Sequence, residues 1–507
     1  MSDSKRKDAG VSGAGMGGMQ MSGQQRAAIG PNLRAMALPF AVILFATLAT
    51  RLIWFGDALA STDEQLYALI GADLAQGHLP YAGLWDRKPI GLFAIIAAGY
   101  HLTGASPLGY QLIAVLFTLA GAGFTYLLAR QLVDRVTACG AAALYPVMMA
   151  LYGAHSGQSE AFHVPLMAAM AWLVFAPGDR RFAARAAAAM LIGGLALQVK
   201  YTVLPQCLLF GVAALWRQHG MGESPLQLAA RALAYAALGL VPQALVALLF
   251  WTNGSFDAFW FANFASFFLR DGLGRMSPDL LAGALPLFVL AATGLYAHWR
   301  IRPVEDRGTY RLYALWFAAA ALTVFLPGTV YLYYFAALVP PTILLALPLL
   351  DRRGRAGVLP LIAVGAAVLL LLAPWKDYRE AQANRAALAG MTQAIAPLVA
   401  DPQQCLWVHD GPAALYLAAR SCLPTRYIYP DHLNNALEDG ALGISQASEV
   451  RRILAAAPPV IVTADTPVTP QNRAVSALVE QAIAAHYRPL HTATIHTRTI
   501  RAWQRVR

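Results

Sequence analysis

The chain has 507 residues, of which 58% are hydrophobic and only 13% are charged. Soluble domains carry roughly 25% charged residues, so a water-soluble globular fold is excluded, because its core would lack a polar shell. The net charge of +11 does not indicate nucleic-acid binding. The basic residues stand at the ends of apolar runs, where membrane topology places them.

Residues 1–33 are rich in Gly, Ser, Met and Gln, and we predict a disordered cytoplasmic tail there. The tail lacks the basic, apolar and small-residue order of a cleaved signal peptide. The first apolar run is therefore expected to remain as a membrane span. Residues 34–374 are predicted to form a transmembrane domain of a polytopic α-helical membrane protein.

Eleven apolar runs in this domain approach the roughly 20 residues that cross a bilayer. They are 35–56, 108–129, 136–151, 162–177, 184–199, 202–216, 228–251, 279–299, 311–326, 331–349 and 356–374. A further run, 90–103, has fourteen residues and is short for a span.

Basic residues decide how the short run is interpreted. If it lies at the membrane interface, fourteen Lys and Arg of the loops fall on the side of the N-terminus, and only six fall on the other side before the C-terminal region. If it spans, Arg130 and Arg135 fall outside, against the positive-inside rule. We therefore predict about eleven transmembrane helices, with the N-terminus cytoplasmic and the C-terminus periplasmic.

This topology makes the first periplasmic loop long, from about 57 to 107. Interfacial helices are expected within it near 64–76 and at 90–103. The aromatic, amphipathic segment 252–278 is expected to lie on the membrane surface.

Residues 375–507 show the pattern of a small periplasmic α/β domain. The predicted elements are helices at 376–397, 412–420, 446–457 and 471–486, and strands at 405–409, 426–429, 460–463, 488–496 and 499–504. Cys405 and Cys422 lie in this domain and form either a disulfide or two free thiols. Cys139 and Cys207 lie in apolar runs and are interpreted as unreactive core residues.

An acidic pair, Asp63-Glu64, stands in the first periplasmic loop. Ser61 and Glu64 fit a capping box at a helix start, with Asp63 favoured by the helix dipole. Dipole compensation needs no particular acid, so we assign Asp63 a catalytic role. Glu64 is kept both as a second catalytic acid and as a structural cap.

Basic residues on the periplasmic side are the second part of the pattern, because charge near a membrane is costly and often functional. Lys88 directly precedes the interfacial helix at headgroup depth, so we expect it to bind a lipid phosphate. Lys200 and Arg270 need a partner, which is either a carboxylate such as Glu160 or a lipid phosphate. Glu160 either caps the following span or belongs to the site. Trp85 is interpreted as an interfacial anchor.

A carboxylate beside cations at headgroup level suits group transfer from a phosphate-linked lipid. The carboxylate takes a proton from an acceptor hydroxyl or amine, and the cations neutralise the departing phosphate. A divalent metal at Asp63 and Glu64 stays open, because no ligand set has diagnostic spacing. His155 is interpreted as a hydrogen-bonded loop residue rather than a metal ligand.

The order of these features resembles the GT-C superfamily of polyprenyl-phosphate-sugar-dependent glycosyltransferases. The most similar branches are the bacterial lipid A aminoarabinose transferases and the protein O-mannosyltransferases. The resemblance covers most of residues 40–350, and its motifs are Asp63-Glu64-Gln-Leu-Tyr67, Gly77-His-Leu-Pro-Tyr81, Trp85-Asp-Arg-Lys88-Pro89, Glu160, Lys200-Tyr201 and Tyr334-Phe-Ala-Ala-Leu-Val-Pro340-Pro341. The chain departs from the family pattern at Ile90, where relatives have a second proline, and at Glu160, where they often have Asp.

The resemblance implies that Asp63 is the general base and that Glu160 is a second acid. It implies that Lys88 and Arg270 bind the phosphate of the donor lipid, and it places Tyr334 at the mouth of a lipid groove. Lys200 is assigned to the same phosphate-binding group. The expected substrate-pocket residues are Tyr67, Tyr81, Arg87, His155, Tyr201 and Tyr331.

The implied activity is transfer of a sugar from a polyprenyl-phosphate carrier to a cell-envelope acceptor at the periplasmic face of a bacterial inner membrane. The acceptor could be lipid A or its core, a polysaccharide or a protein. The competing hypotheses are a transporter or flippase of lipid-linked sugars, which should show internal repeats, and a non-catalytic envelope assembly protein.

Overall fold

The computed structural model describes residues 33–270, 278–327 and 330–506. The predicted disordered tail lies outside these residues except for its last position. Arg275, one of the six basic residues predicted on the periplasmic side, and the neighbouring acid Asp271 lie outside them too. The chain divides into two compact units, Met1–Ala41 and Val42–Arg507. The candidate site lies wholly in the second.

Each of the eleven predicted apolar runs contains a helix. These helices are α1 (Leu33–Arg51), α4 (Leu108–Ala129), α5 (Arg135–Leu151), α6 (Ser159–Phe175), α7 (Phe182–Leu197), α8 (Leu204–Gly220), α9 (Pro225–Thr252), α12 (Pro278–Tyr296), α13 (Arg307–Phe325), α14 (Val339–Leu350) and α15 (Leu359–Leu372). Among the described residues, six helices are long and apolar enough to cross a membrane, and four shorter ones are apolar. The number of eleven spans stays a prediction.

The outer faces of these helices are apolar as well as their packed faces. Leu116 of α4, Leu240 of α9 and Leu285 of α12 are each more than half exposed. Water would penalise such surfaces, whereas lipid tails would not. The exposed leucines therefore support the interpretation of the chain as a membrane protein.

Two helices lie in the first loop, as predicted. They are α2 (Thr62–Ala75) and α3 (Ile90–Thr103). Glycines let α3 pack closely, since a Cβ on Gly91 would stand 2.5 Å from the Gln198 carbonyl oxygen and one on Gly99 would stand 2.3 Å from the Tyr110 nitrogen. The start of α3 is thus held against the end of α7.

The aromatic segment after α9 is helical from Phe256 to Phe268. It comprises α10 (Phe256–Trp260), a π-helical turn at Phe261–Ala265 and α11 (Ser266–Phe268). Phe259, Asn263 and Ser266 are buried, while Trp260 and Phe268 are exposed. This part of the segment is amphipathic, as predicted, and its polar buried side chains face the first loop.

The C-terminal α/β region, predicted to start at residue 375, begins with α16 (Pro374–Ile395), which is followed by a four-stranded sheet in the order β1-β2-β4-β3. Strands β1 and β2 are parallel, and the other pairs are antiparallel. The strands are β1 (Trp407–Val408), β2 (Val460–Ala464), β3 (Tyr487–Ile495) and β4 (Arg498–Arg505), and the helices are α17 (Ala414–Ala418), α18 (Pro430–Asn434), α19 (Gln446–Ala455) and α20 (Arg473–His486). Cys405 and Cys422 form a disulfide, which decides between the two alternatives. The domain boundary at 375 stays a prediction.

The strand predicted at 426–429 is wrong. Residues 426–429 belong to no strand and bend at Arg426 and Tyr429, and the Arg426 carbonyl bonds to the first loop instead of to a sheet. The Trp85 amide donates to the Arg426 carbonyl oxygen at 3.0 Å. Tyr427 packs on the Trp85 ring, with 5.8 Å between ring centroids.

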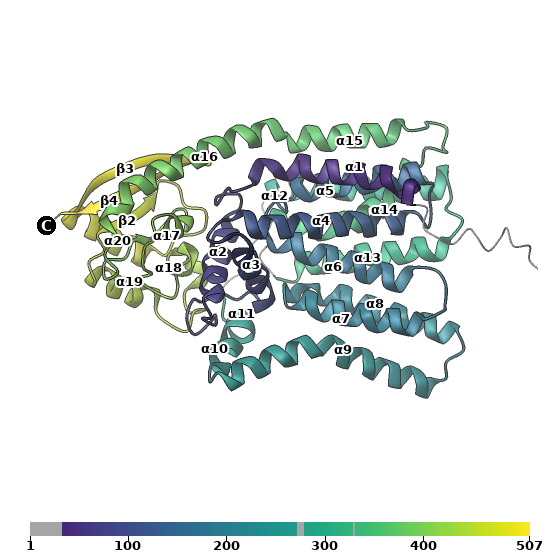
Figure 1. The fold of residues 1–507 in the computed structure, drawn as a ribbon, viewed down its shortest axis with the longest axis horizontal. Coiled ribbons are helices and arrows are strands. Elements are labelled where there is room, and N and C mark those ends of the chain that lie inside the picture. Colours follow the sequence, from purple (N-terminus) through teal and green to yellow (C-terminus); the bar gives the residue numbers. More distant parts are fainter. Residues whose placement is uncertain (1–32, 271–277, 328–329, 507) are drawn as a thin grey trace, which may run out of the picture. The chain divides into compact units, whose positions relative to one another are not determined.

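A shared hydrophobic core holds α2 and α3 to the C-terminal α/β region. Tyr67 and Phe93 belong to the same buried cluster as Leu415 and Tyr427. Helix α17 packs against α2, as can be followed in Figure 1. The first loop and residues more than 300 positions later are therefore one packed body, and the candidate site lies where they meet.

Candidate active site

Asp63 lies in the first turn of α2 and accepts hydrogen bonds from three tyrosine hydroxyls. Tyr67, one turn along, donates to Oδ2 at 3.2 Å, and Tyr333 donates to Oδ2 at 2.7 Å. Tyr429 donates to Oδ1 at 3.3 Å. A carboxylate has about four lone-pair sites, so Oδ1 keeps one for a further donor. Asp63 is thus oriented with one acceptor position left.

The predicted capping box at the start of α2 is wrong. Ser61 is the N-cap residue but makes no side-chain capping bond. The Glu64 carboxylate instead accepts from the Ser156 hydroxyl at 2.9 Å and from the Gly157 amide at 2.8 Å. These two donors lie in the loop between α5 and α6 and are buried with the carboxylate, which gains more from them than from the half-buried N-cap amide of Ser61.

Glu64 is fully buried and joins α2 to the loop between α5 and α6. Gly157 leaves room for this approach, since a Cβ there would stand 2.9 Å from the Tyr110 ring and 3.1 Å from the Glu64 carboxyl carbon. Arg51 donates to the carbonyls of Ala154 and His155 and fixes the same loop from the other side. Glu64 and Arg51 therefore form a structural scaffold that fixes this loop against α2. The Glu64 carboxylate shares no bonding partner with the Asp63 carboxylate.

We expect Glu64 to lower stability as the pH rises from about 5 to about 8. Burial raises the folded-state pKa of Glu64 from 4.5 to about 7, so the folded state binds this proton more tightly than the unfolded state. The stability gained is present below the unfolded pKa and is lost as the pH rises through the folded pKa, with a total of roughly 3 kcal/mol. Thermal unfolding in nanodiscs of wild type and Glu64→Gln measures this, and the variant should lose that part of the slope. Equal pH dependence of the two proteins would contradict the assignment.

His155 belongs to this scaffold, as its interpretation as a loop residue predicted. Its Nε2 lies 2.9 Å from the Ala60 carbonyl oxygen, and its ring stacks on Trp54 with centroids 4.3 Å apart. Burial lowers the pKa of His155 to about 4. The side chain is therefore neutral and bonded to the backbone that precedes α2.

Glu160 and Lys200 form a buried ion pair. The Ser159 hydroxyl donates to Glu160 Oε2 at 2.9 Å, and His163 Nε2 lies 3.7 Å from Oε1. Lys200 Nζ also lies 3.6 Å from the centroid of the Tyr334 ring. The sequence left open a carboxylate or a lipid phosphate as the partner of Lys200, and the structure gives it the carboxylate.

Lys88 has no carboxylate within 4.0 Å among the described residues. Its Nζ stands 5.5 Å from the centroid of the Tyr67 ring, and its backbone carbonyl accepts from the Tyr81 hydroxyl at 2.9 Å. Burial lowers the pKa of Lys88, but the negative charges of Asp86 and Asp63 outweigh it and the pKa is raised. Lys88 is therefore a charged, half-buried donor near Asp63 with unused capacity.

Arg87 and Arg270 converge on one carboxylate, that of Glu438 in the C-terminal α/β region. Arg87 lies 2.6 Å from Glu438 Oε2, and Arg270 lies 2.9 Å from Oε1. Arg87 also donates to the Ser266 hydroxyl at 3.1 Å. The two arginines come from different segments, and Glu438 brings their charges together.

The remaining aromatic residues line the same region. Tyr201 donates to Asn263 Oδ1 at 3.0 Å, and Tyr81 reaches the same oxygen at 3.5 Å. Tyr331 stacks on Tyr333, with centroids 5.6 Å apart. The tyrosines of the sequence prediction are therefore close to the residues around Asp63, Lys88 and Arg270, whereas Glu64 and His155 belong to the scaffold behind them.

Sequence reasoning missed the contribution of the C-terminal α/β region. Tyr429, His432 and Glu438 reach the site, and His432 packs edge-on against Trp85 at 4.9 Å between centroids. A signal was present, since the run Arg426–His432 is dense in Tyr, Asp and His and holds Pro430, which is unfavourable in a strand.

The sequence left open a divalent metal at Asp63 and Glu64, and the groups around these two carboxylates bear on it. Among residues 33–270, 278–327 and 330–506, no group of three or more His, Cys, Asp or Glu is arranged to hold a metal ion. The Asp63 carboxylate is surrounded by hydroxyl donors, and that of Glu64 by Ser156 and Gly157. These surroundings do not fit a shared metal site, and no chemical step is assigned to one.

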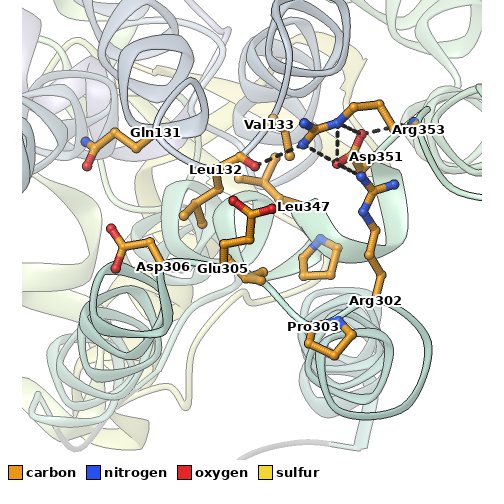
Figure 2. A pocket seen from close by; sticks show the side chains of 12 residues that line it. Gln131, Leu132, Val133, Arg302, Pro303, Glu305, Asp306, Leu347, Asp351 and Arg353 are labelled. Atoms are coloured by element: carbon orange, nitrogen blue, oxygen red, sulfur yellow. Dashed lines mark hydrogen bonds and ion pairs between the residues drawn. The ribbon is translucent and has the colours of Figure 1, made fainter.

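A polar cavity of about 150 Å³ lies among the loops after α4, α12 and α14. Figure 2 shows Asp351 between Arg302 and Arg353 at the edge of this cavity. Asp351 Oδ2 lies 3.1 Å from a guanidinium nitrogen of Arg302 and 2.7 Å from one of Arg353. The Asp351 carboxylate is buried and satisfied by both arginines. These loops are the ones that the charge pattern assigns to the cytoplasm, and we interpret this cluster as a structural ion-pair network.

Residues 87–242 match the family described as dolichyl-phosphate-mannose-protein mannosyltransferase. The matched segment includes Lys88, Glu160 and Lys200 but not Asp63 or Tyr429. No curated protein sequence matches the chain.

Two solved structures of ArnT from Cupriavidus metallidurans are similar to the chain along nearly its whole length. The one bound to undecaprenyl phosphate has 16% sequence identity and a TM-score of 0.59, and the match covers 93% of this chain and 97% of that one. The apo structure has the same identity and TM-score, with coverage of 92% and 98%. The chain has the ArnT fold. The resemblance to GT-C glycosyltransferases that the sequence indicated is confirmed by the family match and by the ArnT fold together.

Proposed function

We propose that the protein is a glycosyltransferase that moves a sugar from a polyprenyl-phosphate carrier to a cell-envelope acceptor. The observation that carries this proposal is the placement of Lys88, a cation without an ion pair among the described residues, near the oriented carboxylate of Asp63. The printed description of one ArnT structure, as bound to undecaprenyl phosphate, supports a lipid-linked donor.

In the proposed reaction, Lys88 and Arg270 bind the phosphate of the donor, with Arg87 beside them. The acceptor hydroxyl gives its proton to the free position on Asp63 Oδ1 and attacks the anomeric carbon. The bond between that carbon and the phosphate oxygen breaks, and its electron pair leaves with the polyprenyl phosphate. The cations neutralise the charge that develops on the leaving group. An amine acceptor would transfer its proton in the same way.

We propose that the site faces the periplasm of a bacterial inner membrane. The positive-inside pattern supports this orientation. The Cys405–Cys422 disulfide supports it too, because disulfides persist in oxidising compartments. The N-terminus is then cytoplasmic, and the C-terminal α/β region, which contributes Tyr429 and Glu438 to the site, is periplasmic.

The test is transfer by the purified full chain in nanodiscs supplied with radiolabelled polyprenyl-phosphate sugars and, in parallel reactions, lipid A, envelope polysaccharide and acceptor protein. Label should move to one acceptor class, with one polyprenyl phosphate released for each sugar transferred. Movement of intact donor across the bilayer without cleavage would instead support the transporter hypothesis. Binding with neither cleavage nor movement would favour an assembly protein.

A further inference from the structure

Glu438 occupies the position between two of the cations that the proposed reaction assigns to the donor phosphate. Its two carboxylate oxygens contact different arginines, Oε2 with Arg87 and Oε1 with Arg270. Only 6% of its side chain is exposed, compared with 20% for Arg87 and 25% for Arg270. The carboxylate is therefore largely desolvated and depends on these two charges.

The contacts of Glu438 are held by charge more than by directed hydrogen bonds. Arg270 Nε and Glu438 Oε2 are buried, yet neither makes a hydrogen bond of acceptable geometry. The directed bonds of Arg87 go to Ser266 and to the Ala441 carbonyl. A phosphate has more acceptor oxygens than a carboxylate and forms strong charge-assisted bonds with guanidinium groups. It could therefore satisfy donors that Glu438 leaves unused.

The backbone around Glu438 is fixed independently of the arginines. Asn435 accepts from the Leu437 amide through its side chain at 3.0 Å, and the Ala436 amide donates to the Pro470 carbonyl at 2.7 Å. Tyr429, at the start of the stretch 429–438, donates a hydrogen bond to Asp63. A side-chain rotation of Glu438 alone could thus release the arginines without unfolding this stretch.

We propose that Glu438 is an internal anion that competes with the donor phosphate for Arg87 and Arg270 and thereby sets the affinity for the lipid. This inference rests on the proposed function. With no donor bound, Glu438 pairs with both arginines and offsets one of their two positive charges. When donor arrives, the phosphate takes its place. After transfer, Glu438 returns to the arginines and favours release of the polyprenyl phosphate.

The experiment measures the dissociation constant of undecaprenyl phosphate for the full chain in nanodiscs. Glu438→Gln removes the competing charge while keeping the shape, so we expect the variant to bind the lipid about tenfold more tightly, which corresponds to about 1.4 kcal/mol. Arg270→Gln should bind it more weakly. Glu449→Gln, which also breaks an arginine–carboxylate pair of the C-terminal α/β region, is the matched control and should bind like wild type.

The outcomes separate the inference from the proposed function. Weaker or unchanged binding by Glu438→Gln, with wild type binding and Arg270→Gln impaired, overturns the competition and leaves the proposed function intact. Absence of lipid binding by both wild type and Glu438→Gln overturns the proposed function and the inference together. Thermal unfolding of each variant without lipid identifies loss of fold. Glu438→Asp keeps the charge, so its affinity for the lipid should lie near that of wild type if Glu438→Gln acts through charge.

Discussion

Asp63→Asn is expected to lower the turnover of sugar transfer by about 10²- to 10⁴-fold while the lipid donor still binds. Asparagine keeps the shape of the side chain but cannot take a proton at the position left on Oδ1. The three tyrosine hydroxyls around it can rotate to meet the amide. Measuring turnover and undecaprenyl phosphate binding separately shows whether chemistry alone is lost.

The matched control for this substitution is Asp73→Asn. Asp73 lies on the same helix, α2, and its carboxylate contacts the exposed His78 at 2.8 Å. The control should transfer sugar at the wild-type rate. Full activity of Asp63→Asn would exclude Asp63 as the base, and equal losses in both variants would indicate damage to α2 rather than to the chemistry.

Lys88→Gln is expected to lower kcat/KM by about 10²- to 10³-fold, the usual cost of removing one preorganised donor to a developing negative charge. Among the described site cations, Lys88 has no ion-pair partner, whereas Arg87 and Arg270 share Glu438 and Lys200 pairs with Glu160. Its charge is therefore the one left for a phosphate. Initial rates over a range of donor concentrations measure the effect.

Two other lysines serve as controls for Lys88. Lys376 is exposed on α16, and Lys376→Gln should leave kcat/KM unchanged. Lys200→Gln leaves Glu160 buried without its partner, which typically costs 3–5 kcal/mol, so its main effect should be on thermal stability. A loss of kcat/KM for Lys88→Gln no larger than that for Lys376→Gln would remove Lys88 from the phosphate site.

The parts of the site that could be predicted from sequence are those controlled by charge and membrane topology. Asp63 and Lys88 are ionisable residues in an apolar chain, and the positive-inside rule placed both in one loop. Helices α2 and α3 could be located as well, because each is one continuous helical run in the sequence. These features depend on residues close together in the sequence.

The parts that could not be predicted depend on partners far along the chain. The sequence around Ser61 and Glu64 satisfies a capping box, but a buried loop with Ser156 and Gly157 offers Glu64 better donors. Residues 426–429 have the composition of a strand, yet the Arg426 carbonyl accepts a hydrogen bond from the Trp85 amide. Nothing local to Glu438 indicates that two arginines from elsewhere will surround it.

The bond between Asp63 and Tyr429 joins residues that are 366 positions apart. At synthesis rates of roughly 5–20 residues per second, about 20–70 s pass between the emergence of one residue and that of the other. For most of that time Asp63 lacks two of its three hydroxyl partners, because Tyr333 also emerges 270 positions after it, and until the end it lacks Tyr429. A nascent chain would thus stay without a completed site until the C-terminal α/β region has been synthesised and folded.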